Sequence, residues 1–257
     1  MAKPFLAAVA VVAFALAGLA VPAHAQEEAP RPPRQQWSFE GVFGTYDRAA
    51  LQRGFQVYQK VCAACHAVKH LYFRDLEDIG YTEDQVKGIA AQYQTTDGPN
   101  DQGEMYQRPA RPSDRFAMPF ANDNAARAAN NGALPPDLSL IVKAREYGPD
   151  YVDALLTGFT EAPKDVKVGE GMYYNAAFPG HQIKMPPPLS EGAVTYADGT
   201  IKATVPQMAH DVVTFLSWAA EPNLEARHRM GFKVIFFLII GAVLLYAAKR
   251  KVWAAIH

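Results

Sequence analysis

Residues 61–66 of this 257-residue chain read Val61-Cys62-Ala63-Ala64-Cys65-His66. The stretch holds both cysteines of the sequence, and a histidine follows the second one directly. Two thiols about one helical turn apart can each form a thioether with one vinyl group of a haem, and the next side chain then lies under the iron. We therefore predict one covalently bound haem c, attached through Cys62 and Cys65, with the neutral imidazole of His66 as an axial ligand.

Two other kinds of site also use a Cys-x-x-Cys pair. A zinc site needs two more ligands, and with no further cysteine in the chain, His70 alone leaves such a site incomplete. A thioredoxin-like redox pair needs a βαβ context, which this sequence does not suggest. The histidine next to the pair favours haem over both alternatives.

The residue on the other side of the iron decides between electron transfer and small-molecule chemistry, because an open iron binds oxygen or peroxide. Met185 is favoured, because the prolines at 186–188 stiffen its loop and reduce the entropy cost of fixing the sulfur. Met118, which precedes Pro119, is the rival, and His181 is a further candidate. Local sequence leaves these alternatives open.

Both ends of the chain carry membrane signals. Residues 1–25 combine Lys3, an apolar run and a small-x-small cleavage pattern, which is typical of a secretory signal peptide. The apolar run 231–248 is long enough to span a bilayer, and the cations at 249–251 favour a cytoplasmic end. We expect a bacterial inner-membrane protein with one span: a cleaved signal peptide (1–25), a periplasmic haem domain (26–226), an anchor with flanking charges (227–251) and a short cytoplasmic tail (252–257).

Charge is unevenly distributed along the chain. All 26 acidic residues lie within residues 26–226, which contain 18 of the 25 cations and so have a formal charge of −8. Such a field repels nucleic acid and attracts a basic partner.

Apolar spacing predicts a mainly α fold. Leu51, Phe55 and Tyr58 recur at helical spacing within 47–61, and a second apolar stripe marks 206–220. A shorter helix is expected at 150–158. Glycine, proline and asparagine indicate irregular structure over 95–136 and 159–204, and Asp198-Gly199 suggests one small hairpin at 194–201. The stripe of 206–220 comprises Met208, Val212, Phe215, Leu216 and Ala219.

The chain resembles the cytochrome c1 family in motifs that follow one another over nearly the whole mature sequence. They are Arg53-Gly54-Phe55-Gln56-Val57-Tyr58, Asp97-Gly98-Pro99-Asn100, the run Ala129 to Ser139, Asp150-Tyr151-Val152, Leu155-Leu156-Thr157-Gly158, the run Phe178 to Leu189, and Trp218-Ala219-Ala220-Glu221-Pro222.

The resemblance implies a class I cytochrome c core with long irregular loops and one C-terminal transmembrane helix. It assigns Cys62 and Cys65 to the thioethers and makes His66 and Met185 the two axial ligands. It also implies that Arg145 lies near a haem propionate, and that the haem pocket is lined by Tyr151, Asn130, Pro135, Pro136 and Phe178. Some bacterial relatives carry an extra disulfide beside the methionine loop, which this chain cannot form because haem consumes both cysteines.

The resemblance further implies a subunit of the cytochrome bc1 complex without independent catalytic activity. It would pass one electron from the Rieske iron–sulfur protein to a soluble or membrane-tethered cytochrome c. Its anchor would pack beside cytochrome b, and the complex would be dimeric. Two alternatives are a free-standing anchored haem enzyme or ligand sensor with an open iron, and an anchored electron shuttle that acts alone.

Overall fold

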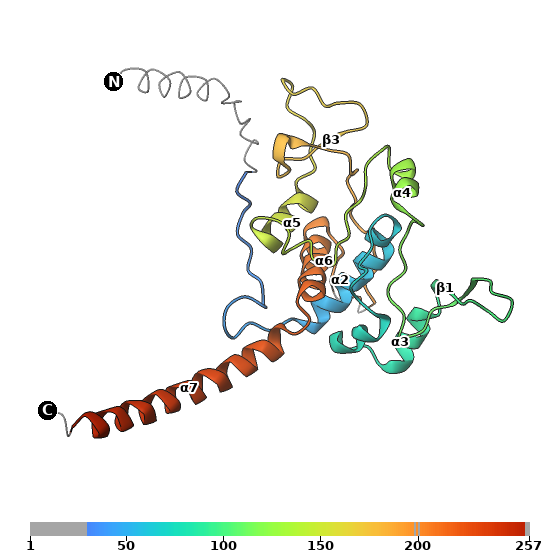
Figure 1. Ribbon diagram of the computed structural model, residues 1–257. Coiled ribbons are helices and arrows are strands. Elements are labelled where there is room, and N and C mark those ends of the chain that lie inside the picture. Colours follow the sequence, from blue (N-terminus) through green and yellow to red (C-terminus); the bar gives the residue numbers. More distant parts are fainter. Residues whose placement is uncertain (1–29, 198, 200, 255–257) are drawn as a thin grey trace, which may run out of the picture.

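The structure, a computed structural model, describes residues 30–197, 199 and 201–254. The expected signal peptide lies outside these residues, as do residues 255–257 of the expected tail. The described part is mainly helical, as the sequence predicts (Figure 1). In chain order its elements are α2 (Arg48–Lys60), 3₁₀ helices at Cys62–Ala64 and Phe73–Ile79, α3 (Glu83–Ala90), β1 (Gln94–Asp97), β2 (Tyr106–Pro109), α4 (Asp123–Ala129), α5 (Gly148–Thr157), β3 (Tyr173–Tyr174), a 3₁₀ helix at Pro179–His181, β4 (Gln182–Ile183), α6 (Val205–Ala220) and α7 (Leu224–Trp253).

The core is built around the packing of α2 against α6, which lie side by side in Figure 1. The side chain of Asp47 caps α2 by accepting the N–H groups of Ala49 and Ala50, and Thr204 caps α6. Gly54 lies at the contact, where an added Cβ would be 2.0 Å from the carbonyl oxygen of Asp211. The five residues of the predicted α6 stripe are all buried, so the predicted helices 47–61 and 206–220 are confirmed.

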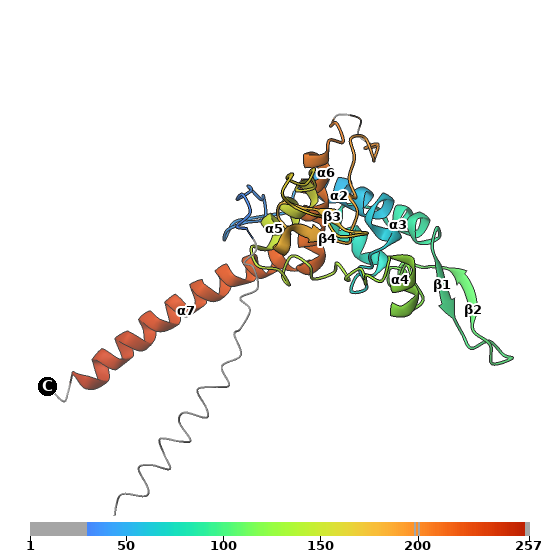
Figure 2. The ribbon, with the colours of Figure 1, turned by 90° about the horizontal axis from the view of Figure 1, so that it is seen from above.

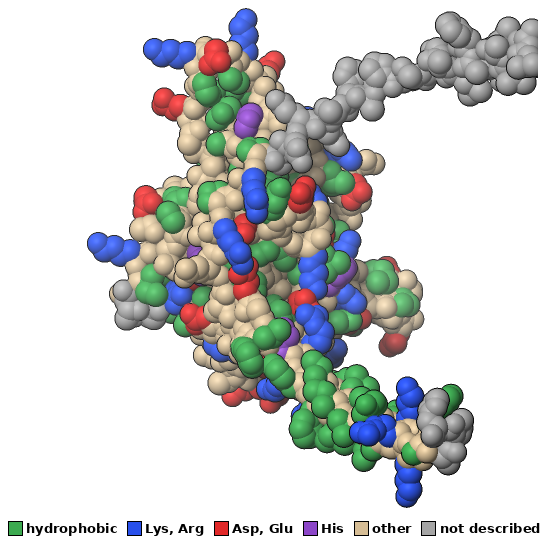
Figure 3. All heavy atoms as spheres, turned by 90° about the vertical axis from the view of Figure 1, so that its left-hand side faces the viewer, with side chains coloured by type: hydrophobic (Ala, Val, Ile, Leu, Met, Phe, Trp, Pro, Cys, Tyr) green, Lys and Arg blue, Asp and Glu red, His purple; other side chains and the backbone are tan. Residues whose placement is uncertain are grey.

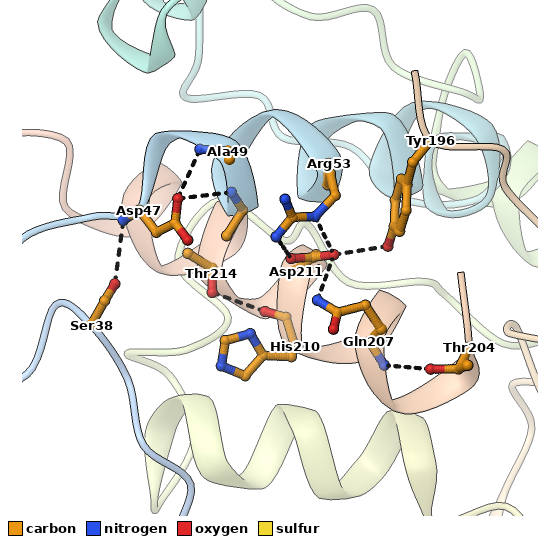
Figure 4. A network of polar contacts seen from close by, with 11 residues as sticks. Ser38, Asp47, Ala49, Arg53, Tyr196, Thr204, Gln207, His210, Asp211 and Thr214 are labelled. Carbon is orange, nitrogen blue, oxygen red and sulfur yellow. Dashed lines mark hydrogen bonds and ion pairs between the residues drawn. The ribbon is translucent and has the colours of Figure 1, made fainter. Parts of the chain in front are cut away.

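A buried ion pair joins the same two helices. Arg53 donates two hydrogen bonds of 2.9 Å to the carboxylate of Asp211, which is 0% exposed (Figure 4). Tyr196 and Gln207 donate to the same carboxylate at 2.9 and 3.1 Å. Because a buried charge is costly unless it is paired and hydrogen-bonded, these contacts fix one position of α2 on α6.

The segment 194–201 corrects one prediction. Its described residues form no strand, so the expected hairpin is wrong. Val194 and Tyr196 are buried, and the hydroxyl of Tyr196 donates to Asp211. These two side chains attach a loop to the core instead of belonging to a pair of strands.

Other segments contain more regular structure than predicted. β1 pairs antiparallel with β2, and α4 follows, so the expectation of irregular structure over 95–136 is partly wrong. Among the described residues between 159 and 204, the regular elements are the two-residue strands β3 and β4 and a short 3₁₀ turn, which confirms a largely irregular segment. α5 begins two residues earlier than predicted and packs on α6.

The C-terminal helix α7 leaves the domain on the side away from the β1–β2 hairpin (Figure 2). Its 30 residues correspond to roughly 45 Å of helix, more than the bilayer core requires. None of its most apolar 18-residue stretch is buried within the described chain, and green side chains cover it in Figure 3. α7 is therefore a candidate membrane span.

Candidate haem site

The two cysteines lie on one turn directly after α2. The amides of Cys65 and His66 donate to the carbonyl oxygen of Cys62 at 3.1 and 2.9 Å, so the backbone turns once between Cys62 and His66. Both thiols are free, with Cys62 half-buried and Cys65 exposed. Burial, and then the neighbouring Cys65, raises the pKa of the Cys62 thiol, so this thiol is protonated in the free protein.

Among the described residues, the imidazole of His66 has one hydrogen-bond partner. Its Nδ1 lies 2.7 Å from the carbonyl oxygen of Pro136, an arrangement in which Nδ1–H donates and Nε2 keeps its lone pair. Burial is the largest influence on this ring and lowers the pKa of His66, which favours the neutral form. A neutral imidazole with a free Nε2 beside two unpaired thiols on one turn fits the ligand set of a haem c.

The segment that provides the Pro136 carbonyl is fastened to the chain just after His66. Leu138 N donates to the carbonyl oxygen of Ala67 at 2.8 Å, and Lys69 N donates to the Asp137 carboxylate at 3.0 Å. These bonds fix residues 136–138 relative to the haem motif. The orientation of His66 is therefore built into the backbone.

Met185 follows β4 in the loop that the prolines stiffen, and its side chain is half-buried. The neighbouring Lys184 donates through Nζ to the carbonyl oxygen of Asn131 at 3.2 Å. Residues 131–136 thus contact both His66 and the loop of Met185. The sixth-ligand role of Met185 stays a prediction.

The two rivals of Met185 have different surroundings. The side chain of Met118 is 59% exposed. The ring of His181 stacks on Tyr174, and its Nδ1 lies 3.3 Å from the carbonyl oxygen of Asn175. His181 is thus engaged within its own loop.

Sequence reasoning missed Asn175, which anchors the loop that leads to Met185. This side chain is 0% exposed; its Oδ1 accepts the N–H groups of Ala177 and Phe178, at 3.0 and 3.1 Å, and its Nδ2 donates to Leu155 O at 2.8 Å. The bond to the amide two residues on is an Asx turn, for which asparagine is a preferred residue. An asparagine shortly before Phe178-Pro179-Gly180 is the signal that predicts it.

The remaining predicted pocket residues are spread over three segments. Tyr151 is buried in α5; burial raises its pKa and the charge of Arg145 lowers it, so these two residues lie within electrostatic range. Arg145 is itself exposed and donates to the carbonyl oxygen of Ala144. Asn130 ends α4 by donating to the carbonyl oxygen of Ala126 at 2.7 Å.

Pro135, Pro136 and Phe178 lie in the two loops already described. Pro135 and Phe178 are half-buried, and the amide of Phe178 is bonded to Asn175. Of all predicted pocket residues, the contacts bring Pro136 to the haem motif. For the other five, a place beside a haem stays a prediction.

Comparison with known proteins gives one consistent result. The model of the Cytochrome C1 family matches residues 37–256. Cytochrome c1 of Rhodospirillum rubrum is 47% identical over 236 residues, which are 86% of each chain. A mitochondrial cytochrome c1 haem protein of Arabidopsis thaliana is 49% identical over 224 residues, 87% of this chain and 73% of its own.

A third relative is longer than this chain. Cytochrome b/c1 of Bradyrhizobium diazoefficiens is 53% identical over 257 residues, which cover 91% of this chain and 37% of the relative. This chain thus spans little more than a third of that protein. Because the family model covers most of the chain and the identities lie near one half, the chain belongs to the cytochrome c1 family, whose members are haem subunits of the cytochrome bc1 complex.

Proposed function

We propose that this chain takes one electron from the Rieske iron–sulfur protein and gives it to a soluble or membrane-tethered cytochrome c. One haem c, bound covalently, supplies the one-electron chemistry. The observation that carries the proposal is the 2.7 Å contact between His66 Nδ1 and the Pro136 carbonyl oxygen, beside two unpaired thiols on one turn. The chain makes and breaks no substrate bond and has no catalytic activity of its own.

Each site residue has a distinct task in this proposal. Cys62 and Cys65 tether the haem, and His66 ligates the iron through Nε2. Met185 would supply a thioether to the iron, which would exclude oxygen and peroxide and favour the reduced state. Arg145 offsets the charge of a propionate. Tyr151, Asn130, Pro135, Pro136 and Phe178 line the pocket.

The partners follow from the anchor and from the relatives. We assign α7 a place beside cytochrome b, which the name of the Bradyrhizobium relative supports by joining b and c1. Residues 249–251 are then cytoplasmic and the haem domain periplasmic, after removal of residues 1–25. The complex is dimeric in this proposal.

The acidic haem domain provides a physical route to the acceptor. Its formal charge of −8 over residues 26–226 attracts a basic cytochrome c, and salt screens that attraction. Reduction of the acceptor should therefore slow as ionic strength rises. A rate that does not depend on salt contradicts this route.

The ligand assignment is tested by comparing two methionine variants of the full-length protein. Met185→Leu should remove the weak band near the red end of the oxidised spectrum and let the reduced haem bind carbon monoxide. Met118→Leu is the matched control, because that side chain is 59% exposed, and it should leave both properties unchanged.

Three outcomes contradict the proposal. Avid carbon monoxide binding by the unmodified protein favours the open-iron enzyme or sensor, and the absence of added porphyrin mass removes the haem altogether. Purification of the solubilised protein without cytochrome b and the Rieske protein favours a shuttle that acts alone.

A further inference from the structure

The segment before α2 runs along the first turns of α7. Glu225 accepts the N–H of Tyr46 and a guanidinium N–H of Arg48, both at 2.9 Å. His228 donates through Nδ1 to the carbonyl oxygen of Gly44 at 3.3 Å. Residues 44–48 are therefore fastened to the start of the candidate membrane helix.

A ring contact continues this attachment by one more turn. Phe43 stacks on Phe232 with 5.2 Å between the ring centroids and 18° between the planes. Glu225, His228 and Phe232 are spaced by three and four residues, so they lie on one face of α7. Going from Arg48 back to Phe43, the chain contacts successive turns of this face, so that Phe43 lies nearest to the apolar part of the helix.

The contact with Phe232 sets the depth of Phe43 relative to a bilayer. Phe232 is the second residue of the apolar run 231–248 and thus lies at the end of the span that is nearer to the domain. Phe43 packs against it and lies at the same level. In Figure 3, apolar side chains continue from α7 to its junction with the domain.

The tip of this segment is apolar and open. Gly41, with φ +76°, allows the chain to turn, and the two residues that follow expose 65% (Val42) and 80% (Phe43) of their side chains. Neighbouring large apolar side chains so exposed indicate a contact with something apolar. Arg229 and Lys233 lie within one helical turn of Phe232 on α7 and complement anionic lipid headgroups, whereas Arg227 pairs with Glu221.

We propose that residues 41–44, the membrane-facing turn, are a second membrane contact of this protein, with Val42 and Phe43 inserted at the boundary between lipid headgroups and acyl chains. Lipid is the occupant because the turn continues the exposed apolar surface of α7 and lies near Arg229 and Lys233. With two points of contact, the domain is held in one orientation relative to α7 and the membrane. The inference rests on the proposed span of α7.

Photo-crosslinking in membranes that contain the full-length, haem-loaded protein tests this inference. Phe43 or Val42 is replaced by the photoreactive amino acid p-benzoylphenylalanine, and adducts are identified by mass spectrometry after irradiation. Phe236 and Leu245 are positive controls, because they lie nine residues apart and thus on opposite faces of α7. The exposed Met118 is the negative control.

Lipid adducts at 43 and 42, with none at 118, are the expected result. Both tip positions expose most of their side chain, so the replacements should not disturb folding. Lipid adducts at 236 or 245 but none at 43 or 42 overturn the membrane-facing turn and leave the span intact. An adduct of 43 and 42 with another polypeptide also overturns it. No lipid adduct at 236 and 245 rejects the span and the turn together.

Discussion

The contact of α2 with α6 and the loops around His66 are held together in different ways. Two interlocking helices, Gly54 at their contact and the ion pair Arg53–Asp211 fix the first region from many directions. The loops at 131–138 and 175–185 are instead fixed by a few hydrogen bonds, such as that of His66 to Pro136 and those of Asn175. The helices position the cysteines, and the loops orient the proposed axial ligands.

Breaking the buried ion pair should have the largest effect on the helical region. Arg53→Ala leaves the Asp211 carboxylate buried without its cation, which costs about 3–5 kcal/mol. Thermal unfolding of the detergent-solubilised protein, followed by circular dichroism, measures the loss. Replacing both partners, Arg53→Met with Asp211→Leu, should recover part of it: no charge is then left unpaired, but Tyr196 and Gln207 lose this acceptor. Equal losses in both variants contradict this explanation.

The same contrast explains what the sequence could predict. Apolar residues three and four apart, such as Leu51, Phe55 and Tyr58, are specific to one helical face, so α2 and α6 are predictable from spacing alone. The Cys62–His66 motif likewise predicts its own haem-binding residues, because all of them lie within one turn.

Contacts between distant segments leave no such local pattern. The bond from His66 to Pro136 joins residues 70 positions apart, and Asn175 reaches Leu155 across 20. Tyr196 resembles a strand residue locally, although its partner is the buried Asp211. The hairpin prediction failed for this reason: Asp198-Gly199 is a local turn signal, whereas Tyr196 is held by a residue of a distant helix.

Removing a buried carboxyl on α5 should have the next largest effect, because this group makes the stability of the helical region depend on pH. Burial raises the pKa of Asp153 to about 6, opposed by His210 and reinforced by Asp150. The folded state keeps this proton up to about pH 6, while the unfolded chain loses it near about pH 4. Because the folded state binds more protons in this window, stability falls as pH rises through it and stays lower above it.

Asp153→Asn should therefore stabilise the protein at pH 7 by as much as about 3 kcal/mol and flatten its stability between about pH 4 and 6. Urea unfolding at a series of pH values measures both changes. Asp165→Asn, at an exposed position, is the control for the change in net charge. A parallel shift of the two variants at every pH contradicts the role of burial.

In the loop region, Asn175→Ala tests whether one polar side chain holds the loop of residues 175–185 in place. The substitution leaves two backbone N–H groups and the Leu155 carbonyl without their partner, at a cost of about 1–3 kcal/mol for a buried group. We expect lower stability together with carbon monoxide binding by the reduced haem, because the loop of Met185 loosens.

Asn100 provides a matched control for this variant. Its Oδ1 accepts the amides of Gln102 and Glu104 in the turn of the β1–β2 hairpin. Asn100→Ala removes the same kind of turn away from the haem motif and should leave carbon monoxide binding unchanged. If the reduced haem of both variants binds carbon monoxide equally, the position of the Met185 loop does not depend on Asn175.

Two glycines in helices should respond to alanine in opposite directions. A Cβ at Gly54 would meet the carbonyl oxygen of Asp211, so Gly54→Ala must push α2 and α6 apart, at a cost of about 1–3 kcal/mol. Gly88 in α3 has no atom within 4 Å of an added Cβ, so Gly88→Ala should stabilise by about 1 kcal/mol through helix propensity. That propensity gain also applies at Gly54, so the net loss there is smaller than the overpacking cost.

Because α2 ends at the turn that carries Cys62, a shift of this helix moves the thiols relative to the Pro136 carbonyl. Haem content should therefore fall in Gly54→Ala and not in Gly88→Ala; equal haem content in both would show that the loops, rather than the helices, position the cysteines.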